Sequence, residues 1–446
     1  MTLLLVVFVF GGMIFLHELG HYLAARFFKI EVEEFGFGIP PRLWRFWRAK
    51  GSITIGGQKI EIPSNYDIPL DPQSDLNKNA RATVDSVNGK FVLRTVELAA
   101  PSQSAAAANP APAQRGAIEI NGPVTALEQG TEFTLNWLPL GGFVRPKGEG
   151  DPDVPGGLAA ANPWKRLVVL FAGPAMNLLT AVVVTSIIIA QMGVAVPGKV
   201  LIEEVTPNSP AQLAGIQPQD VIVSIAGKPV TSMEEARAMI RASLDQPLEM
   251  TFERGGQLVT LTVTPLSSRT AEQGALGVGL AYPRRDATLF EAIGGGFTYT
   301  GIQALTILYI PIGLIQGVIA PEEARLVGLK GIYDFFGQAV ERDTESRQAA
   351  LEPSDGSSAP ASSQPTNYVL SLVAMLSISL GVMNLLPIPA LDGGRILFTL
   401  PEILFRRRIP PRLENVINGV AFLFLIGLML FVNLLDFINP ANISLP

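Results

Sequence analysis

Cysteine is absent from this chain of 446 residues, and only two histidines occur in it. The lack of cysteine excludes disulfides, thiolate metal ligands and cysteine nucleophiles. Charged residues make up 16% of the chain, whereas in soluble proteins about a quarter of the residues are charged. The formal net charge of -6 excludes the strongly basic surface that is typical of nucleic-acid binding. Together with a positive mean hydropathy of +0.34, this composition favours a membrane protein.

Five apolar runs are long enough to cross a bilayer, which takes about 20 helical residues. They lie at residues 3–28, 167–196, 297–320, 368–391 and 416–435. The first run lacks the positive start and the clean cleavage site of a signal peptide, so we expect it to be retained as a membrane span.

Basic residues orient these runs, because the cytoplasmic flanks of membrane spans are enriched in Lys and Arg. Clusters of them follow the first run, precede the second and separate the fourth from the fifth: Lys29, Arg42, Arg45, Arg48, Lys50; Arg145, Lys147, Lys165, Arg166; Arg406, Arg407, Arg408, Arg412. With these clusters inside, both termini are extracytoplasmic. A crossing at 297–320 would put the last cluster outside, so we expect that run to be re-entrant or to lie on the membrane surface.

The sequence therefore predicts a multi-span α-helical membrane protein with four transmembrane helices. The expected spans are residues 1–28, 164–196, 367–392 and 415–436, and the expected connections are 29–163, 197–283, 284–366 and 393–414. The cytoplasmic connection 29–163 contains an insertion, 51–130, with short strand-like runs and a low-complexity stretch, 100–114, that is typical of a flexible linker. Residues 197–283 alternate apolar and polar side chains and contain a helix opened by Ser232, which indicates a small α+β domain.

Both histidines lie inside the first apolar run, in the sequence HELGH at residues 17–21. On a helix this H-E-x-x-H spacing puts two imidazoles on one face with a glutamate beside them, which suits a zinc ion and the activation of water. His17 is about 21 Å along the helix, within the cytoplasmic half of the bilayer. A chance match is the alternative. It is disfavoured because polar groups within a span are costly unless they have a function.

A catalytic zinc usually takes three protein ligands, and without a third His or any Cys the last ligand must be a carboxylate. Asp392, in the sequence MNLLPIPALDGGR, ends the fourth apolar run at a depth comparable with that of His17. Two prolines break the helix before it, and two glycines free the backbone so that the carboxylate can turn inward. The alternative is an ordinary carboxylate at a helix end.

These motifs, HExxH in a first span and N-x-x-P-x-P-x-L-D-G-G in a later one, resemble those of the site-2 protease family. The resemblance covers residues 1–48, 131–340 and 366–436, and it is greatest to the bacterial branch with extracytoplasmic PDZ domains that cleaves anti-sigma factors. It implies one zinc ion per chain, held by His17, His21 and Asp392, with Glu18 as the catalytic acid/base. Asn384 resembles the asparagine that holds the substrate backbone, although it could instead cap backbone groups freed by the prolines.

Three further segments are similar to parts of this family. Residues 131–149 look like its membrane-associated β-hairpin, in which Gly141 and Gly142 would contact an extended substrate. The sequence FAGPAMN matches a pattern of the second span, in which Asn177 could line the substrate site or serve helix packing alone. Residues 197–283 resemble a PDZ domain whose carboxylate loop would comprise five residues: Leu276, Gly277, Val278, Gly279 and Leu280. Peptide binding and exclusion of bulky substrates both remain open for it.

The resemblance implies a zinc endopeptidase of a bacterial plasma membrane that cuts single-span membrane proteins inside their transmembrane helices. Anti-sigma factors and signal-peptide remnants are the implied substrates, after a first cut by an upstream site-1-type protease. The implied partners are thus this protease, the substrate and the lipid bilayer, without nucleic acid. The alternatives are an inactive PDZ-bearing scaffold and a metal transporter. A transporter would need several further acidic or His residues along the spans. Besides the site residues, the expected spans contain only Asp436, at the end of the last one.

Overall fold

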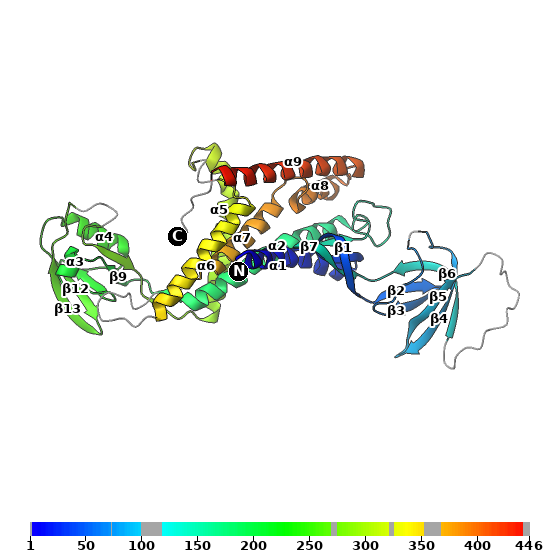
Figure 1. Ribbon diagram of the computed structural model, residues 1–446, viewed down its shortest axis with the longest axis horizontal. Coiled ribbons are helices and arrows are strands. Elements are labelled where there is room, and N and C mark those ends of the chain that lie inside the picture. Colours follow the sequence, from blue (N-terminus) through cyan, green and yellow to red (C-terminus); the bar gives the residue numbers. More distant parts are fainter. Residues whose placement is uncertain are drawn as a thin grey trace.

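The computed structural model describes residues 2–72, 74–99, 118–268, 274–320, 325–351 and 367–439. The molecule is elongated, with a central group of helices, a β-barrel at one end and a small α/β domain at the other (Figure 1). Within the described residues, five helices are long and apolar enough to cross a membrane: α1 (Thr2–Phe27), α2 (Pro163–Met192), α5 (Leu289–Ile315), α7 (Tyr368–Leu385) and α9 (Pro411–Ile438). Two more helices, α6 (Leu329–Leu351) and α8 (Asp392–Phe405), accompany them.

Glycines bring the backbones of α1, α2 and α7 into close contact. A Cβ atom on Gly20 of α1 would lie 2.3 Å from the carbonyl oxygen of Ala172 in α2, and one on Gly381 of α7 would lie 3.1 Å from that of Pro174. The expected span 367–392 is a helix only to Leu385, because two prolines follow. A separate helix, α8, begins at Asp392, where a connection was expected.

The segment from Arg284 to Asn367 begins and ends at the same end of α2. Arg284 donates a hydrogen bond of 3.3 Å to the carbonyl of Met192, and the Asn367 side chain donates one to Gln191. The run expected to be re-entrant or surface-lying belongs to α5, a continuous helix that packs along α2. The chain returns through α6, whose Asp343 carboxylate accepts hydrogen bonds from the first amides of α7.

Two long strands, β1 (Val32–Arg48) and β7 (Glu132–Pro146), form a sheet beside α1. Residues 34–37 of β1 are bordered on one side by residues 142–145 of β7 and on the other by residues 132–135. The prediction that residues 131–149 form a hairpin of their own is therefore wrong, because both halves of β7 pair with β1. Pairing with β1 satisfies backbone groups that an isolated hairpin would leave at its edges.

The insertion forms a closed five-stranded barrel between β1 and β7. Its strands, in the order β2-β3-β5-β4-β6, are β2 (Gly51–Ile55), β3 (Gln58–Ile62), β4 (Asn79–Val87), β5 (Lys90–Leu98) and β6 (Ile118–Glu128). Isoleucine, valine and leucine side chains fill its interior. Hydrogen bonds of 2.7 and 2.9 Å join Asp67 of the barrel to Arg45 of β1, and they lower the pKa of the Asp67 carboxyl. The linker expected at 100–114 lies outside the described residues.

Residues 200–281 form the α/β domain, as the alternating pattern predicts. An antiparallel sheet has the order β13-β12-β10-β9-β14, with short strand β11 paired to β10. Its elements are β9 (Val200–Val205), α3 (Pro210–Leu213), β10 (Val221–Ile225), β11 (Lys228–Pro229), α4 (Met233–Ala242), β12 (Leu248–Arg254), β13 (Gln257–Val263) and β14 (Val278–Ala281). Ser232 caps α4 by accepting a hydrogen bond of 3.2 Å from the amide of Glu235, as expected. The paired strands β8 (Val194–Ala195) and β15 (Arg284–Arg285) connect this domain to α2 and α5.

Candidate active site

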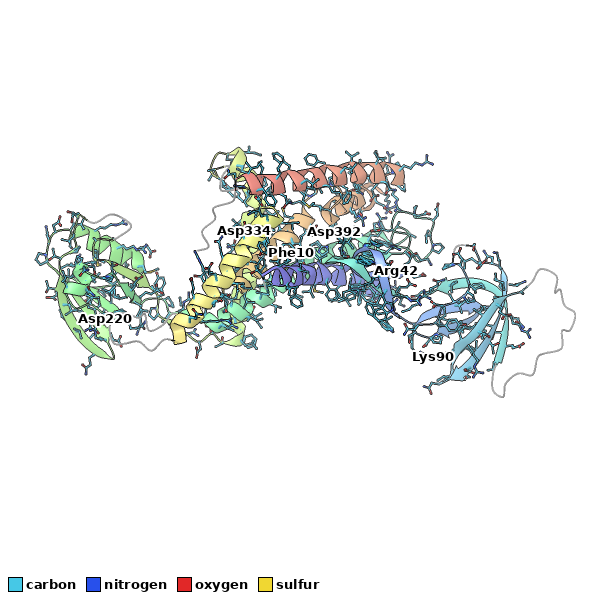
Figure 2. The ribbon with its side chains drawn as sticks, viewed as in Figure 1. Phe10, Arg42, Lys90, Asp220, Asp334 and Asp392 are labelled. Atoms are coloured by element: carbon cyan, nitrogen blue, oxygen red, sulfur yellow. The ribbon has the colours of Figure 1, made fainter. Side chains whose placement is uncertain are left out.

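Three side chains from the two ends of the sequence meet inside the helix group. The Nε2 atoms of His17 and His21 lie 3.2 Å apart, and Oδ2 of Asp392 lies 3.1 Å from the first and 3.4 Å from the second. Figure 2 shows Asp392 within the central helices, between the two β-containing domains. The periodicity of α1 aligns the histidines, and the chain reversal after α7 brings in the carboxylate.

The spacing of these atoms fits a zinc ion. Ligands about 2.1 Å from a tetrahedral zinc are separated from each other by about 3.4 Å, close to the three observed distances. Two imidazole nitrogens and one carboxylate oxygen are also a ligand set of catalytic zinc, which leaves one position for water. Within the part of the chain that the structure describes, His17, His21 and Asp392 are the group of three or more His, Asp or Glu side chains that could hold a metal ion.

Helix α2 backs this cluster and orients both imidazoles. Nδ1 of His21 donates a hydrogen bond of 2.8 Å to the carbonyl of Val169, so its Nε2 carries the lone pair that faces the cluster. Nδ1 of His17 lies 3.1 Å from the carboxamide of Asn177. Between them, a Cβ atom on Gly173 would lie 2.3 Å from Nε2 of His21 and 2.8 Å from Nε2 of His17. Only a glycine leaves room for the metal at this position.

Glu18 lies between the cluster and the edge of the β1/β7 sheet. Its Oε2 atom accepts a hydrogen bond of 3.0 Å from the amide of Val144 in β7. Gly141 and Gly142 precede this amide; Gly141 packs on Ile14 of α1, and a Cβ atom on Gly142 would lie 4.0 Å from Glu18. The cluster, Glu18 and this strand line a common cavity of about 160 Å³, large enough for a peptide group and water.

The remaining residues expected at the site are absent from the lining of this cavity. Asn384 is half-buried in the last turn of α7, eight residues before Asp392. Asn177 lies behind His17 and does not line the cavity. Residues 276–280 belong to the separate α/β domain, at β14 and the turn before it. Sequence reasoning missed the Val169 carbonyl and the Gly173 gap, although both lie in or beside the quoted FAGPAMN segment.

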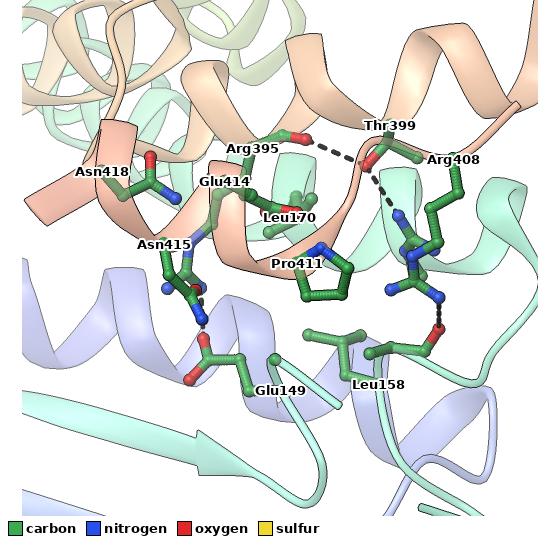
Figure 3. A pocket seen from close by; sticks show the side chains of 13 residues that line it. Glu149, Leu158, Leu170, Arg395, Thr399, Arg408, Pro411, Glu414, Asn415 and Asn418 are labelled. Atoms are coloured by element: carbon green, nitrogen blue, oxygen red, sulfur yellow. Dashed lines mark hydrogen bonds and ion pairs between the residues drawn. The ribbon is translucent and has the colours of Figure 1, made fainter. Parts of the chain in front are cut away.

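A second cavity, of about 140 Å³, adjoins the first and shares Glu149, Leu158, Leu170 and Arg395 with it. Arg395, one turn after Asp392, forms an ion pair with Glu149, which follows β7 (Figure 3). Arg166 and Arg408 line the far side, where Arg408 donates a hydrogen bond of 2.9 Å to a main-chain carbonyl. This charged cavity connects the metal cluster to the basic segment 406–412.

Comparison with known proteins also indicates a zinc-dependent peptidase. Residues 5–64 and 121–428 match peptidase family M50, and the unmatched stretch between them includes β4 and β5 of the barrel. A Clostridium perfringens protein named as a candidate zinc metalloprotease is 32% identical over 70% of this chain and 84% of the relative. The zinc metalloprotease RasP of Oceanobacillus iheyensis and the regulator of sigma-W protease RasP of Bacillus subtilis are each 26% identical over 97% of both chains.

The extent of the family match and the identity to the Clostridium protein agree with a cluster of two histidines and one aspartate set beside a glutamate. The five apolar helices agree with a multi-pass membrane protein. The chain belongs to peptidase family M50, the site-2 protease family, and is a zinc metalloprotease.

Proposed function

We propose that this zinc metalloprotease hydrolyses a peptide bond inside the transmembrane helix of a single-span membrane protein. The observation that carries the proposal is the position of the cluster. His17 and His21 lie in the second half of α1, a helix long and apolar enough to span the bilayer, and their third partner starts α8 beside the end of another such helix. A peptide bond that reaches this cluster must itself be within the membrane.

We propose four crossings, by α1, α2, α7 and α9, in a bacterial plasma membrane with both termini extracytoplasmic. The return of residues 284–367 to the same end of α2 supports this in one respect, because it excludes a single crossing between α2 and α7. The four tryptophans support the placement of the inner interface, where such rings concentrate. Trp44, Trp47 and Trp137 of the β1/β7 sheet and Trp164 at the start of α2 are 63%, 42%, 65% and 62% exposed.

In the proposed mechanism His17, His21 and Asp392 hold the zinc ion, which when bound lowers the pKa of a water molecule and polarises the peptide carbonyl. Glu18 takes the proton of that water and returns it to the leaving nitrogen. The Val144 amide holds the Glu18 carboxylate in place. The β7 segment from Gly141 to Val144 lies at the sheet edge beside Glu18, where an unwound substrate can add as a strand.

Asn384, in the last turn of α7, is proposed to hold the substrate backbone. The α/β domain is proposed to be an extracytoplasmic PDZ domain. Among the described residues, strand β14 pairs in the sheet with β9 alone, so the other edge of residues 276–280 can accept a peptide C-terminus. Either this binding or steric exclusion would restrict the protease to substrates that an upstream protease has already shortened.

The Bacillus relative is named as a regulator of sigma-W protease, which supports an anti-sigma factor as the substrate here. A catalytically inactive scaffold would not need both a full set of zinc ligands and a glutamate beside them. In this chain the three expected zinc ligands meet, and the glutamate lies beside them.

Cleavage of a single-span reporter with a short ectodomain, in proteoliposomes of the full chain, tests the proposal. We expect a cut within the apolar segment of the reporter, located by mass spectrometry, that stops when a zinc chelator is added and resumes with zinc. Cuts confined to the soluble flanks of the reporter would contradict the proposal.

Cysteine labelling tests the topology, since the native chain has no thiol. A membrane-impermeant maleimide should label Ser268→Cys in the α/β domain and Glu345→Cys in α6 from outside the cell. Ser86→Cys in the barrel should react only after the membrane is opened. All three positions are exposed in the structure. External labelling of Ser86→Cys, or protection of Glu345→Cys, would contradict the four-span arrangement.

A further inference from the structure

Asn177 is a fully buried polar side chain on the side of His17 that faces away from the metal. Its relative exposure is 0%, and its carboxamide lies 3.1 Å from Nδ1 of His17, whereas Nε2 of the same ring points to the cluster. Asn177 is absent from the lining of the catalytic cavity. A substrate in that cavity would therefore meet the imidazole and not this side chain.

The chemistry of the imidazole defines what Asn177 has to do. If Nε2 of His17 binds zinc, its lone pair is used there, and Nδ1 carries the ring proton. A protonated Nδ1 needs an acceptor. Among the described residues Oδ1 of Asn177 has no hydrogen-bond partner, and rotating the carboxamide by 180° places this oxygen against Nδ1. This rotation gives a hydrogen-bond partner both to the Nδ1–H group of His17 and to Oδ1 of Asn177.

The position of Asn177 is itself held by α7. Its main-chain carbonyl accepts a hydrogen bond of 2.8 Å from the Ser377 hydroxyl, and Ser377 is also fully buried. The Val169 carbonyl lies eight residues earlier on α2. It accepts the hydrogen bond from Nδ1 of His21, just as the rotated Asn177 carboxamide would accept one from Nδ1 of His17. Two turns of one helix therefore present one acceptor to each imidazole, with Gly173 between them.

We propose that Asn177 is a positioning residue of the metal centre: it fixes the tautomer and the ring orientation of His17 and does not bind substrate. This inference rests on the proposed zinc ligands. It assigns to the asparagine of FAGPAMN a different role from the substrate contact that the sequence resemblance implies. Loss of such an outer hydrogen bond typically weakens metal binding about 10- to 100-fold.

The test is the zinc affinity of the full-length protein in detergent, measured by competition with a chromogenic chelator. Asn177→Leu keeps the volume and removes the acceptor, so we expect affinity to fall about 10- to 100-fold. Asn177→Asp keeps an acceptor and should retain at least the native affinity. Thr185→Ala is the control, because Thr185 is buried on the same helix two turns away and should leave affinity unchanged.

With saturating zinc, the KM for a single-span reporter should be the same in Asn177→Leu and in the native chain. Unchanged zinc affinity with a raised KM would overturn the proposal and restore a substrate contact. Should the leucine variant not fold, loss of zinc by Asn177→Asp would overturn it as well. Failure of the proposed function is distinguishable: the reporter would then not be cut within its apolar segment, while the effect of Asn177→Leu on zinc affinity would persist.

Discussion

Replacing Gly173 by alanine should remove zinc binding and proteolysis together. The added Cβ atom would lie 2.3 Å from Nε2 and 2.6 Å from Cε1 of His21, and 2.8 Å from Nε2 of His17, in the space where the metal binds. These atoms belong to stiff, hydrogen-bonded rings, so α1 and α2 would have to separate. We expect less than about one hundredth of native activity, because the ligands that lower the pKa of water are displaced.

Gly12→Ala is the matched control. Gly12 also lies in a membrane helix, but a Cβ atom there would meet nothing within 4 Å, and alanine favours a helix by up to about 1 kcal/mol relative to glycine. It should keep native zinc content and activity. Zinc content is measured by elemental analysis of the purified proteins. Normal zinc content in Gly173→Ala would mean that the metal lies elsewhere.

Replacing Glu18 by glutamine should abolish cleavage while zinc remains bound. Glutamine still accepts the Val144 hydrogen bond but cannot take a proton from water, and a general base contributes about 10²- to 10⁴-fold to the rate. The measurement is single-turnover cleavage of the reporter beside zinc content. Glu33→Gln, an exposed glutamate just beyond α1, should behave as the native chain. Cleavage by Glu18→Gln at the native rate would reassign the base.

Short sequence motifs were enough to predict two features of the site, the spacing of the histidines and the third ligand. The i, i+4 spacing of His17 and His21 follows from helix geometry, and Asp392 follows as a carboxylate expected at a depth comparable with that of His17. Neither the histidine spacing nor the choice of Asp392 predicts that the backbones of α1 and α2 lie so close together. The role of Gly173 depends on a contact between residues about 150 positions apart, and a glycine in a membrane helix has several possible explanations without that contact.

The β structure was harder to predict for the same reason. The segment 131–149 has the alternation and the glycine pair of a hairpin, yet its partner is β1, about 100 residues earlier in the chain. The barrel depends on pairings such as β3 with β5, which join strands separated by β4. Short runs such as GSITI indicate a strand, but they do not specify which other strand will pair with it.

Length and charge give different expectations for α5. By length and hydropathy α5 qualifies as a fifth span, and the helix is continuous. The basic segment 406–412 indicated instead that residues 297–320 do not cross, and this stays a prediction. In the structure the chain returns through α6, an amphipathic helix that carries too much charge to count as a span by composition.

Zinc K-edge X-ray absorption, with the zinc content of the same samples, tests the central claim most directly. The native protein should hold one zinc per chain with about two imidazole nitrogens and with oxygen ligands at about 2.0–2.1 Å, and without sulfur. In Asp392→Asn the zinc content should fall, because a neutral amide is a poor ligand. Full zinc occupancy and an unchanged spectrum in Asp392→Asn would contradict a metal site built jointly by α1 and α8.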